Sequence, residues 1–384
     1  MRAHDERREA EERQDRVSRA LSGAGPAAGP EALDSATVAP WIDALLAQAI
    51  ALRVTDVHLE LAADPGVVRY RIDGALHQAR RVSRSSSLAI LGELETRAGL
   101  AGATSSLPRS GRMSITAGAG AVVMDVMVVP NRGGERVVIR ILEPPPLALD
   151  DLGLSPSHRA LLNRLLERPS ALLISSGPTS SGKSTTLYAL ADELGRRGHA
   201  AVAVEGHCTH ASPPLPTIAI QPREGLAHAV NAALQRDPEV LLIDELLDRA
   251  AIELSLDVAG TRTVLTASDA LSFERLADLG IDPGRARERI SAIVHQRLVR
   301  VLCTACKEAH ETDAPSRITL YRAVGCAACV FTGFHGRTGV FAFEQPEPAD
   351  TSPRSIAERL REDGMRHVLA GITSREEVIT TIPP

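Results

Sequence analysis

A glycine-rich segment near the middle of the chain carries residue types that bind phosphate. Residues 177–184 have the sequence GPTSSGKS, which fits the pattern G-x-x-x-x-G-K-[S/T]. The apolar run Ala171–Ser175 before it predicts a buried strand, and residues 185–191 after it predict the first turns of a helix. A helix N-terminus attracts anions, because its first N–H groups lack partners and the helix dipole is positive there. The segment therefore predicts a nucleoside triphosphate site.

Two side chains of this segment have expected partners of their own. Lys183 would contact the outer phosphates, and the hydroxyl of Ser184 would ligate Mg²⁺. ATP and Mg²⁺ are therefore the expected cofactors. The residues expected to bind the nucleotide are Gly177, Pro178, Thr179, Ser180, Ser181, Gly182, Lys183, Ser184 and Thr185.

A pair of acidic residues follows a later apolar run. Val240–Ile243 predicts a buried strand, and Asp244 and Glu245 come directly after it. In P-loop proteins the first acidic residue at such a strand end can hold Mg²⁺ through water, and the next can orient the nucleophile. We therefore expect Asp244 to bind the cofactor and Glu245 to be catalytic. The alternative is that both are solvated residues at the end of a strand.

The cysteines form the third chemical feature. Four of the five lie in two C-x-x-C pairs, Cys303 with Cys306 and Cys326 with Cys329, and nineteen residues separate the pairs. Without an export signal, this spacing favours structural Zn²⁺ over disulfides. Four protein ligands leave no open position for a substrate, so the zinc would be structural. The alternative is four unrelated buried thiols, and Cys208 is expected to have no special chemistry.

Length and composition limit the class of protein. A chain of 384 residues with 44% hydrophobic and 24% charged residues suits two or three globular domains. Its net charge of -5 gives no reason to expect nucleic acid. No segment approaches the roughly 18–20 apolar residues that span a bilayer, and the charged N-terminus lacks an apolar signal segment. We therefore expect a cytoplasmic protein.

The order of expected elements divides the chain into regions. From residue 151 onward strands and helices alternate, which predicts a parallel α/β sheet with strands near 171–175, 201–204, 218–220, 240–243 and 263–266. We predict a disordered N-terminal tail (1–35), a small α+β domain (36–143), a proline-rich linker (144–150), an α/β P-loop core (151–300), a tetracysteine zinc-binding subdomain (301–340) and a C-terminal helical segment (341–384).

A series of ordered matches resembles one family. The chain resembles the secretion ATPase superfamily, the motors of type II secretion and type IV pilus assembly. The residues that carry the resemblance are TDVHLE at 55–60, VRYRIDG at 68–74, GERVVIRIL at 134–142, GPTSSGKSTT at 177–186, HQRLVRVLC at 295–303 and the second cysteine pair with GFHGRTGV at 333–340.

The resemblance implies a fold and a setting. It implies a RecA-like P-loop ATPase domain, a smaller N-terminal α+β domain with some likeness to PAS domains, and a tetracysteine hairpin. It also implies a homo-oligomer, usually a hexameric ring, that sits at the inner face of the cytoplasmic membrane through a platform or docking protein. ATP would bind between the two domains, and its hydrolysis would power pilin or pseudopilin assembly and protein secretion.

The resemblance also implies roles for three residues. Glu205 matches a glutamate that helps to position the attacking water, Glu245 matches the catalytic glutamate, and Arg140 matches an arginine of the N-terminal domain that contacts phosphate. Other family residues are missing. Residues 265–270 lack the histidine of the family's His box, and Leu247 stands in place of an arginine. Residues 125–128 lack a second arginine.

These departures leave three functions open. The first is a motor ATPase, slow or dependent on a partner, since arginines at a transferring phosphoryl group supply much of the rate. The second is a nucleotide-binding regulatory or structural paralogue that has lost turnover. The third, a zinc-bearing DNA translocase, is disfavoured by the acidic balance and by the lack of a basic groove lined with aromatic residues.

Overall fold

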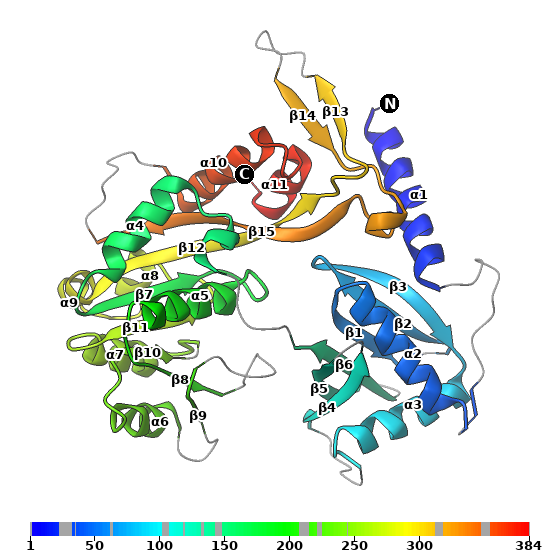
Figure 1. The fold of residues 1–384 in the computed structure, drawn as a ribbon, viewed down its shortest axis with the longest axis horizontal. Coiled ribbons are helices and arrows are strands. Elements are labelled where there is room, and N and C mark those ends of the chain that lie inside the picture. Colours follow the sequence, from blue (N-terminus) through cyan, green and yellow to red (C-terminus); the bar gives the residue numbers. More distant parts are fainter. Residues whose placement is uncertain are drawn as a thin grey trace. The chain divides into compact units, whose positions relative to one another are not determined.

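The structure is a computed structural model that forms two compact units (Figure 1). The first comprises Met1–Glu143, Leu302–Ala309 and Arg322–Gly336, and the second comprises Pro144–Val301, His310–Tyr321 and Arg337–Pro384. The residues described are 2–22, 33–34, 36–61, 64–101, 107–117, 120–131, 134–142, 148–206, 215–220, 225–243, 245–311, 318–346 and 354–383.

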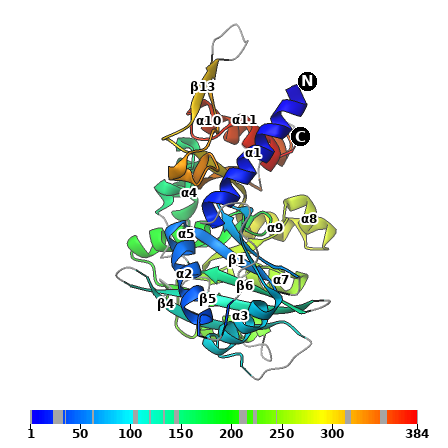
Figure 2. The same cartoon turned by 90° about the vertical axis from the view of Figure 1, so that its right-hand side faces the viewer.

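The first unit is built on a six-stranded antiparallel sheet in the order β3-β2-β1-β6-β5-β4. Burial alternates along β2, which gives the sheet one buried face. Helices α2 (Val38–Ala51) and α3 (Arg84–Arg97) share a single core with that face (Figures 1 and 2). The strands are β1 (Val54–Glu60), β2 (Gly66–Ile72), β3 (Ala75–Val82), β4 (Arg109–Ala117), β5 (Gly120–Asn131) and β6 (Gly134–Ile141).

Helix α1 (Arg2–Ser22) lies where the sequence predicts a disordered tail. Val17 and Leu21, four residues apart on one face of α1, are buried in the core of the first unit. The end of the helix is held by Gln48, which donates to the Leu21 carbonyl at 3.2 Å, and by Arg80, which donates to the Ser22 carbonyl at 2.8 Å. Val17 and Leu21 are the only large apolar side chains in this highly charged helix, too few to show helical periodicity, so the sequence pattern did not reveal it.

The second unit is built on a seven-stranded sheet in the order β15-β12-β7-β11-β10-β8-β9. Every pair from β12 to β9 is parallel, and β7, β10 and β11 are buried along their whole length. This confirms the predicted α/β class and the strands predicted for it. The strands are β7 (Ala171–Ser176), β8 (Ala201–Glu205), β9 (Thr217–Ala219), β10 (Val240–Ile243), β11 (Thr263–Ser268), β12 (Ile290–Leu302) and β15 (Phe334–Glu344).

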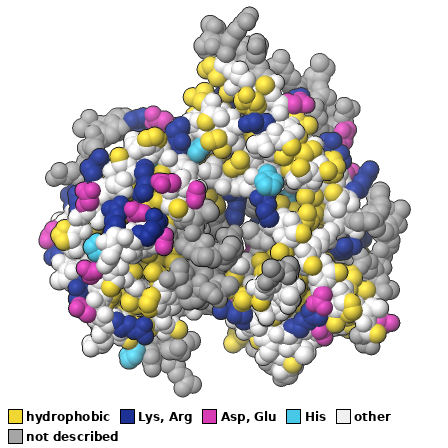
Figure 3. Space-filling view, in the orientation of Figure 1, with side chains coloured by type: hydrophobic (Ala, Val, Ile, Leu, Met, Phe, Trp, Pro, Cys, Tyr) yellow, Lys and Arg dark blue, Asp and Glu magenta, His cyan; other side chains and the backbone are white. Residues whose placement is uncertain are grey.

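Helices cover both faces of this sheet. One core joins the sheet to α4 (Pro156–Leu166) and α5 (Lys183–Arg196), and a second joins it to α6 (Gly225–Leu234) and α7 (Arg249–Val258). On the surface of this unit, Lys and Arg side chains are interspersed with Asp and Glu side chains (Figure 3). The remaining elements are η1 (Leu149–Leu152), α8 (Phe273–Asp278), α9 (Pro283–Arg289), α10 (Ile356–Leu369), α11 (Arg375–Thr381), the hairpin β13 (Glu308–Glu311) and β14 (Thr319–Arg322), and η2 (Ala327–Cys329).

The region boundaries predicted from the sequence stay predictions, and the structure differs from two of them. Residues 302–309 and 322–336, which carry the cysteines, belong to the compact unit that holds the N-terminal domain. The predicted C-terminal helical segment begins at 341, whereas strand β15 continues to Glu344 and α10 begins at Ile356. Within the part of the chain that the structure describes, no helix combines the length and the apolar character needed to cross a membrane.

Leu21→Ala tests the packing of α1. Because Leu21 is fully buried, we expect the free energy of unfolding of the first unit to fall by about 2–5 kcal/mol. Urea unfolding followed by circular dichroism measures this change. Arg19→Ala, at an exposed position on the same helix, is the control and should alter stability by less than about 0.5 kcal/mol. Equal stability of Leu21→Ala and the unaltered protein would mean that α1 does not pack in this way.

Candidate nucleotide site and cysteine cluster

The glycine-rich segment connects β7 to α5 at the carboxyl end of an interior parallel strand. Gly182 is the N-cap of α5 with φ +90°, so it provides no side chain to cap the helix. A Cβ atom at Gly177 would lie 2.6 Å from both the Gln296 carbonyl oxygen and the Ser181 hydroxyl. The Ser181 hydroxyl is buried and has no hydrogen-bond partner among the described residues. Donors without partners at the start of a helix fit a phosphate group.

Neighbouring strands hold this segment in place. The Gln296 side chain on β12 donates to the Ser181 carbonyl at 2.8 Å and accepts from the Ser175 hydroxyl at 2.8 Å. On the other side, the N–H of Gly177 donates to the Ser268 carbonyl at the end of β11, at 3.1 Å. The segment is therefore fixed by the strands on both sides of β7, which gives its backbone a defined orientation.

Lys183 is held at the centre of the site by three oxygen atoms. Its Nζ lies 2.7 Å from the Gly177 carbonyl oxygen, 2.8 Å from Glu245 Oε1 and 2.6 Å from Asp269 Oδ1. The Lys183 side chain is only 10% exposed, whereas Asp269 is 63% exposed. The Lys183 ammonium holds the pKa of Asp269 below its usual value, because it donates a hydrogen bond to the carboxylate.

The structure brings together some of the predicted site residues. It places Glu245, which follows β10, against Lys183. Asp244 lies outside the described residues. Glu205, at the end of β8, is buried and accepts a hydrogen bond from the Tyr188 hydroxyl on α5 at 2.5 Å. Sequence analysis missed Asp269 as a partner of Lys183, and no local pattern could reveal a contact between residues so far apart in the chain.

Arg140 lies on β6 of the first unit. Its Nε donates to Asp56 Oδ1 on β1 at 3.1 Å, and its side chain is 57% exposed. Asp56 also pairs with Arg71 Nε at 3.3 Å, so one buried carboxylate orients two arginines on the same face of the sheet. The expected contact between Arg140 and phosphate stays a prediction.

A neighbouring residue completes this polar face. His58, next on the same face of β1, lies with its Nδ1 3.2 Å from Arg136 Nη2 and its Nε2 3.4 Å from Arg71 Nη2. Burial, reinforced by the charge of Arg71, lowers the pKa of His58. A neutral imidazole can accept a hydrogen bond from a guanidinium, whereas an imidazolium cannot. A neutral His58 has one acceptor nitrogen, so it accepts a hydrogen bond from one of these two arginines, and its tautomer decides which.

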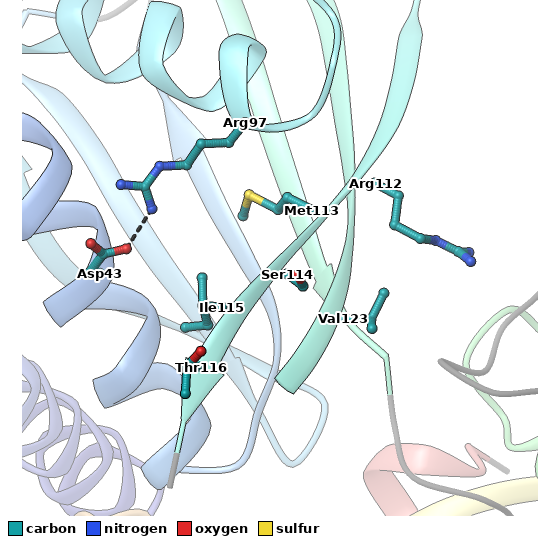
Figure 4. Close-up of a pocket in the computed structure, with 8 residues that line it drawn as sticks. All are labelled: Asp43, Arg97, Arg112, Met113, Ser114, Ile115, Thr116 and Val123. Atoms are coloured by element: carbon teal, nitrogen blue, oxygen red, sulfur yellow. Dashed lines mark hydrogen bonds and ion pairs between the residues drawn. The ribbon is translucent and has the colours of Figure 1, made fainter. Parts of the chain in front are cut away.

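A hollow of about 940 Å³ in the first unit is a poorer candidate for an anion site (Figure 4). It lies between α2, α3 and the edge strand β4. Arg97 and Asp43 form an ion pair across it at 2.5 Å, and Arg112 pairs with Asp125 at 2.8 Å. The charged residues that the structure describes at the hollow, Asp43, Arg97 and Arg112, are therefore each paired with an opposite charge.

The four cysteines of the C-x-x-C pairs form one cluster. Their Sγ atoms all lie within 4.8 Å of one another and no disulfide joins them. The distances from Cys303 to Cys326, from Cys326 to Cys329 and from Cys306 to Cys329 are 4.0, 3.9 and 3.8 Å. A tetrahedral ion with Zn–S bonds of about 2.3 Å requires sulfur atoms about 3.8 Å apart. The cluster is therefore compatible with zinc.

The surroundings of the cluster also suit thiolate ligands. The N–H groups of Gly325, Cys326 and Gly333 donate to cysteine sulfurs at 3.2–3.3 Å. Burial raises the pKa of the Cys306 thiol to about 12, so a cation is needed to deprotonate it near neutral pH. The predicted ligand set Cys303, Cys306, Cys326 and Cys329 thus has the geometry and donors of a metal site.

Comparison with known proteins identifies the family. The family described as "Type II/IV secretion system protein" matches residues 31–380. The chain belongs to this family. Type II secretion system protein E of Pseudomonas aeruginosa is 32% identical over 381 residues, covering 90% of this chain and 76% of that protein. Type II secretion system ATPase E of Vibrio cholerae is also 32% identical, over 382 residues, covering 91% of this chain and 76% of that protein.

Two solved structures have the same fold. The ATPase DotB of Legionella pneumophila superposes with a TM-score of 0.65 at 17% identity, covering 92% of this chain and 97% of that one. The pilus retraction motor PilT superposes with a TM-score of 0.55 at 20% identity, covering 89% and 97%. The family and these superpositions confirm the predicted resemblance and fold class. The chain is therefore a member of the type II/IV secretion system protein family, and it has the fold of the ATPase DotB and of the motor PilT.

Proposed function

We propose that the chain is the motor ATPase of a type II secretion or type IV pilus-like assembly system. In this role it hydrolyses ATP to power pilin or pseudopilin assembly and protein secretion. The observation that carries the proposal is the contact of 2.8 Å between Lys183 at the start of α5 and Glu245 after β10. It joins the phosphate-binding lysine to the carboxylate expected to act on the attacking water. Membership of the family supports the same function.

We assign the residues of the site as follows. Backbone N–H groups of 177–185 and the Lys183 ammonium bind the phosphates, and Ser184 and Asp244 hold Mg²⁺. When bound, Mg²⁺ stabilises the charge on the phosphate oxygens. Glu245 orients and deprotonates the attacking water.

Two more residues act around this centre. Glu205 is buried against Tyr188 of α5, so we assign it a positioning role at the helix that begins with Lys183. Arg140, exposed on the first unit and oriented by Asp56, contacts the transferring phosphate. An arginine at that position stabilises the charge of the transition state.

The cellular setting follows from the family. We propose a homo-hexamer at the inner face of the cytoplasmic membrane, held there by a platform or docking protein. We also propose Zn²⁺ as the ion of the cysteine cluster, because the sulfur distances suit its tetrahedral coordination.

A second function is a nucleotide-binding subunit without turnover. Leu247 replaces the family arginine and is 83% exposed, so no cation stands at that position of the loop after β10. The His box histidine is also missing from 265–270. This alternative keeps nucleotide and zinc binding and lacks phosphate release.

Phosphate release from ATP distinguishes the two functions. The protein is purified with zinc and assembled into a hexamer by fusion to a hexameric scaffold, with Lys183→Ala as the blank. We expect release above the blank and a reduction of about 10²-fold or more in Glu245→Gln, because the base that activates water is lost. Nucleotide binding by the unaltered protein without release above the blank would contradict the motor and leave the regulatory subunit.

Zinc content tests the metal assignment. We expect about one zinc ion per chain in the purified protein, measured by inductively coupled plasma mass spectrometry, and its loss in Cys306→Ser. The same substitution should lower the unfolding midpoint of the first unit, since metal binding is coupled to folding. Lys183→Ala is the matched control and should retain zinc. A zinc-free unaltered protein, or zinc retained by Cys306→Ser, would contradict the assignment.

A further inference from the structure

The loop between β11 and α8 brings an unexpected carboxylate to the nucleotide site. Asp269 follows Ser268, the last residue of β11, and β11 pairs directly with β7, which carries the phosphate-binding segment. Its Oδ1 lies 2.6 Å from Lys183 Nζ. This segment lacks the family's histidine, and it carries Asp269 beside the site.

The loop is held firmly enough to position Asp269. The Ser176 hydroxyl at the end of β7 donates to the Leu271 carbonyl at 2.9 Å and accepts from the Leu271 N–H at 3.0 Å. At the end of the loop, the Phe273 N–H donates to Glu344 Oε1 at 3.1 Å, and Glu344 Oε2 lies 2.9 Å from His295 Nε2. The pairing of β11 with β7 before Asp269 and these contacts after it thus fix its backbone next to the phosphate-binding segment.

The charges at this point require a cation. Asp269 and Glu245 share the single ammonium of Lys183, so the three side chains carry a net negative charge. If Lys183 turns to phosphate oxygens, the two carboxylates remain beside each other without the cation that separates them. Two carboxylates that contact the same ammonium repel each other when it leaves, and a divalent cation relieves the repulsion. The buried Ser181 hydroxyl, which has no partner among the described residues, adds a further donor for the incoming phosphate.

We propose that Asp269 is a carboxylate of the Mg²⁺-nucleotide site that exchanges its cation when nucleotide binds. In the empty site it holds Lys183 together with Glu245. In the occupied site Lys183 moves to the phosphates. The divalent cation then neutralises the negative charge of the Asp269 and Glu245 carboxylates. This inference rests on the proposed function, because it requires that nucleotide bind at Lys183. It makes nucleotide binding by this chain strongly dependent on Mg²⁺.

Affinity for a fluorescent ADP, mant-ADP, tests the exchange. The full chain is titrated in excess Mg²⁺ and, separately, in EDTA, and the ratio of the two dissociation constants measures the coupling between cation and nucleotide. For Asp269→Asn we expect the dissociation constant to rise in Mg²⁺, because a partner of the cation is lost. In EDTA we expect it to fall, because a charge that competes for Lys183 and repels phosphate is removed. The ratio of the dissociation constant in EDTA to that in Mg²⁺ should therefore decrease by about tenfold.

The control is Asp150→Asn, which removes the same charge from η1. Asp150 is 78% exposed and pairs with Arg159 at 2.9 Å, so its coupling should match that of the unaltered protein. Asp269 is 63% exposed, so its substitution by asparagine should leave the fold intact, as circular dichroism would verify.

Two other results would contradict either the role of Asp269 or the nucleotide site at Lys183. If Asp269→Asn tightens binding in both solutions, or changes neither, Asp269 is no part of the cation site and the inference is overturned. If the unaltered protein binds mant-ADP no better than Lys183→Ala, the proposed function fails as well. The comparison with Lys183→Ala thus separates failure of the nucleotide site from failure of the role of Asp269.

Discussion

The ammonium of Lys183 is the charge around which the site is organised. It lies at the start of α5, within 2.8 Å of two carboxylates and of the Gly177 carbonyl oxygen. A cation with such partners neutralises acidic side chains that would otherwise repel one another and repel phosphate. In the role proposed for this site, nucleotide competes for Lys183, and the divalent cation that accompanies it compensates the carboxylates. This competition links phosphate binding to cation binding at a single side chain.

The parallel sheet brings Lys183 and the two carboxylates together. Residues from the carboxyl ends of adjacent parallel strands gather at one edge of a sheet. Here β7 supplies the phosphate-binding segment, β11 supplies Asp269 and β10 supplies Glu245. Gln296 on β12 closes the opposite side through the Ser181 carbonyl. The cysteine cluster belongs to the other compact unit.

The sequence predicted those parts of the structure that depend on local pattern. Continuous apolar runs identified the buried strands. The spacing of the cysteines identified four thiols that the structure brings together, and phosphate binding at the glycine-rich segment stays a prediction. Prediction from the sequence failed where a contact joins segments that are distant in the chain. Asp269 meets Lys183 only because β11 pairs with β7, and α1 is recognised as a helix only by the burial of Val17 and Leu21. The hydrogen bond that buries Glu205 against Tyr188 is likewise invisible in the spacing of either residue.

A crystal structure of the protein with Mg²⁺ and a non-hydrolysable ATP analogue tests the central claim most directly. The account predicts that Lys183 Nζ leaves Asp269 and Glu245 and contacts the outer phosphates, while the two carboxylates face the Mg²⁺ ion through its water ligands. A structure in which the analogue is bound and Lys183 still contacts both carboxylates would contradict the account.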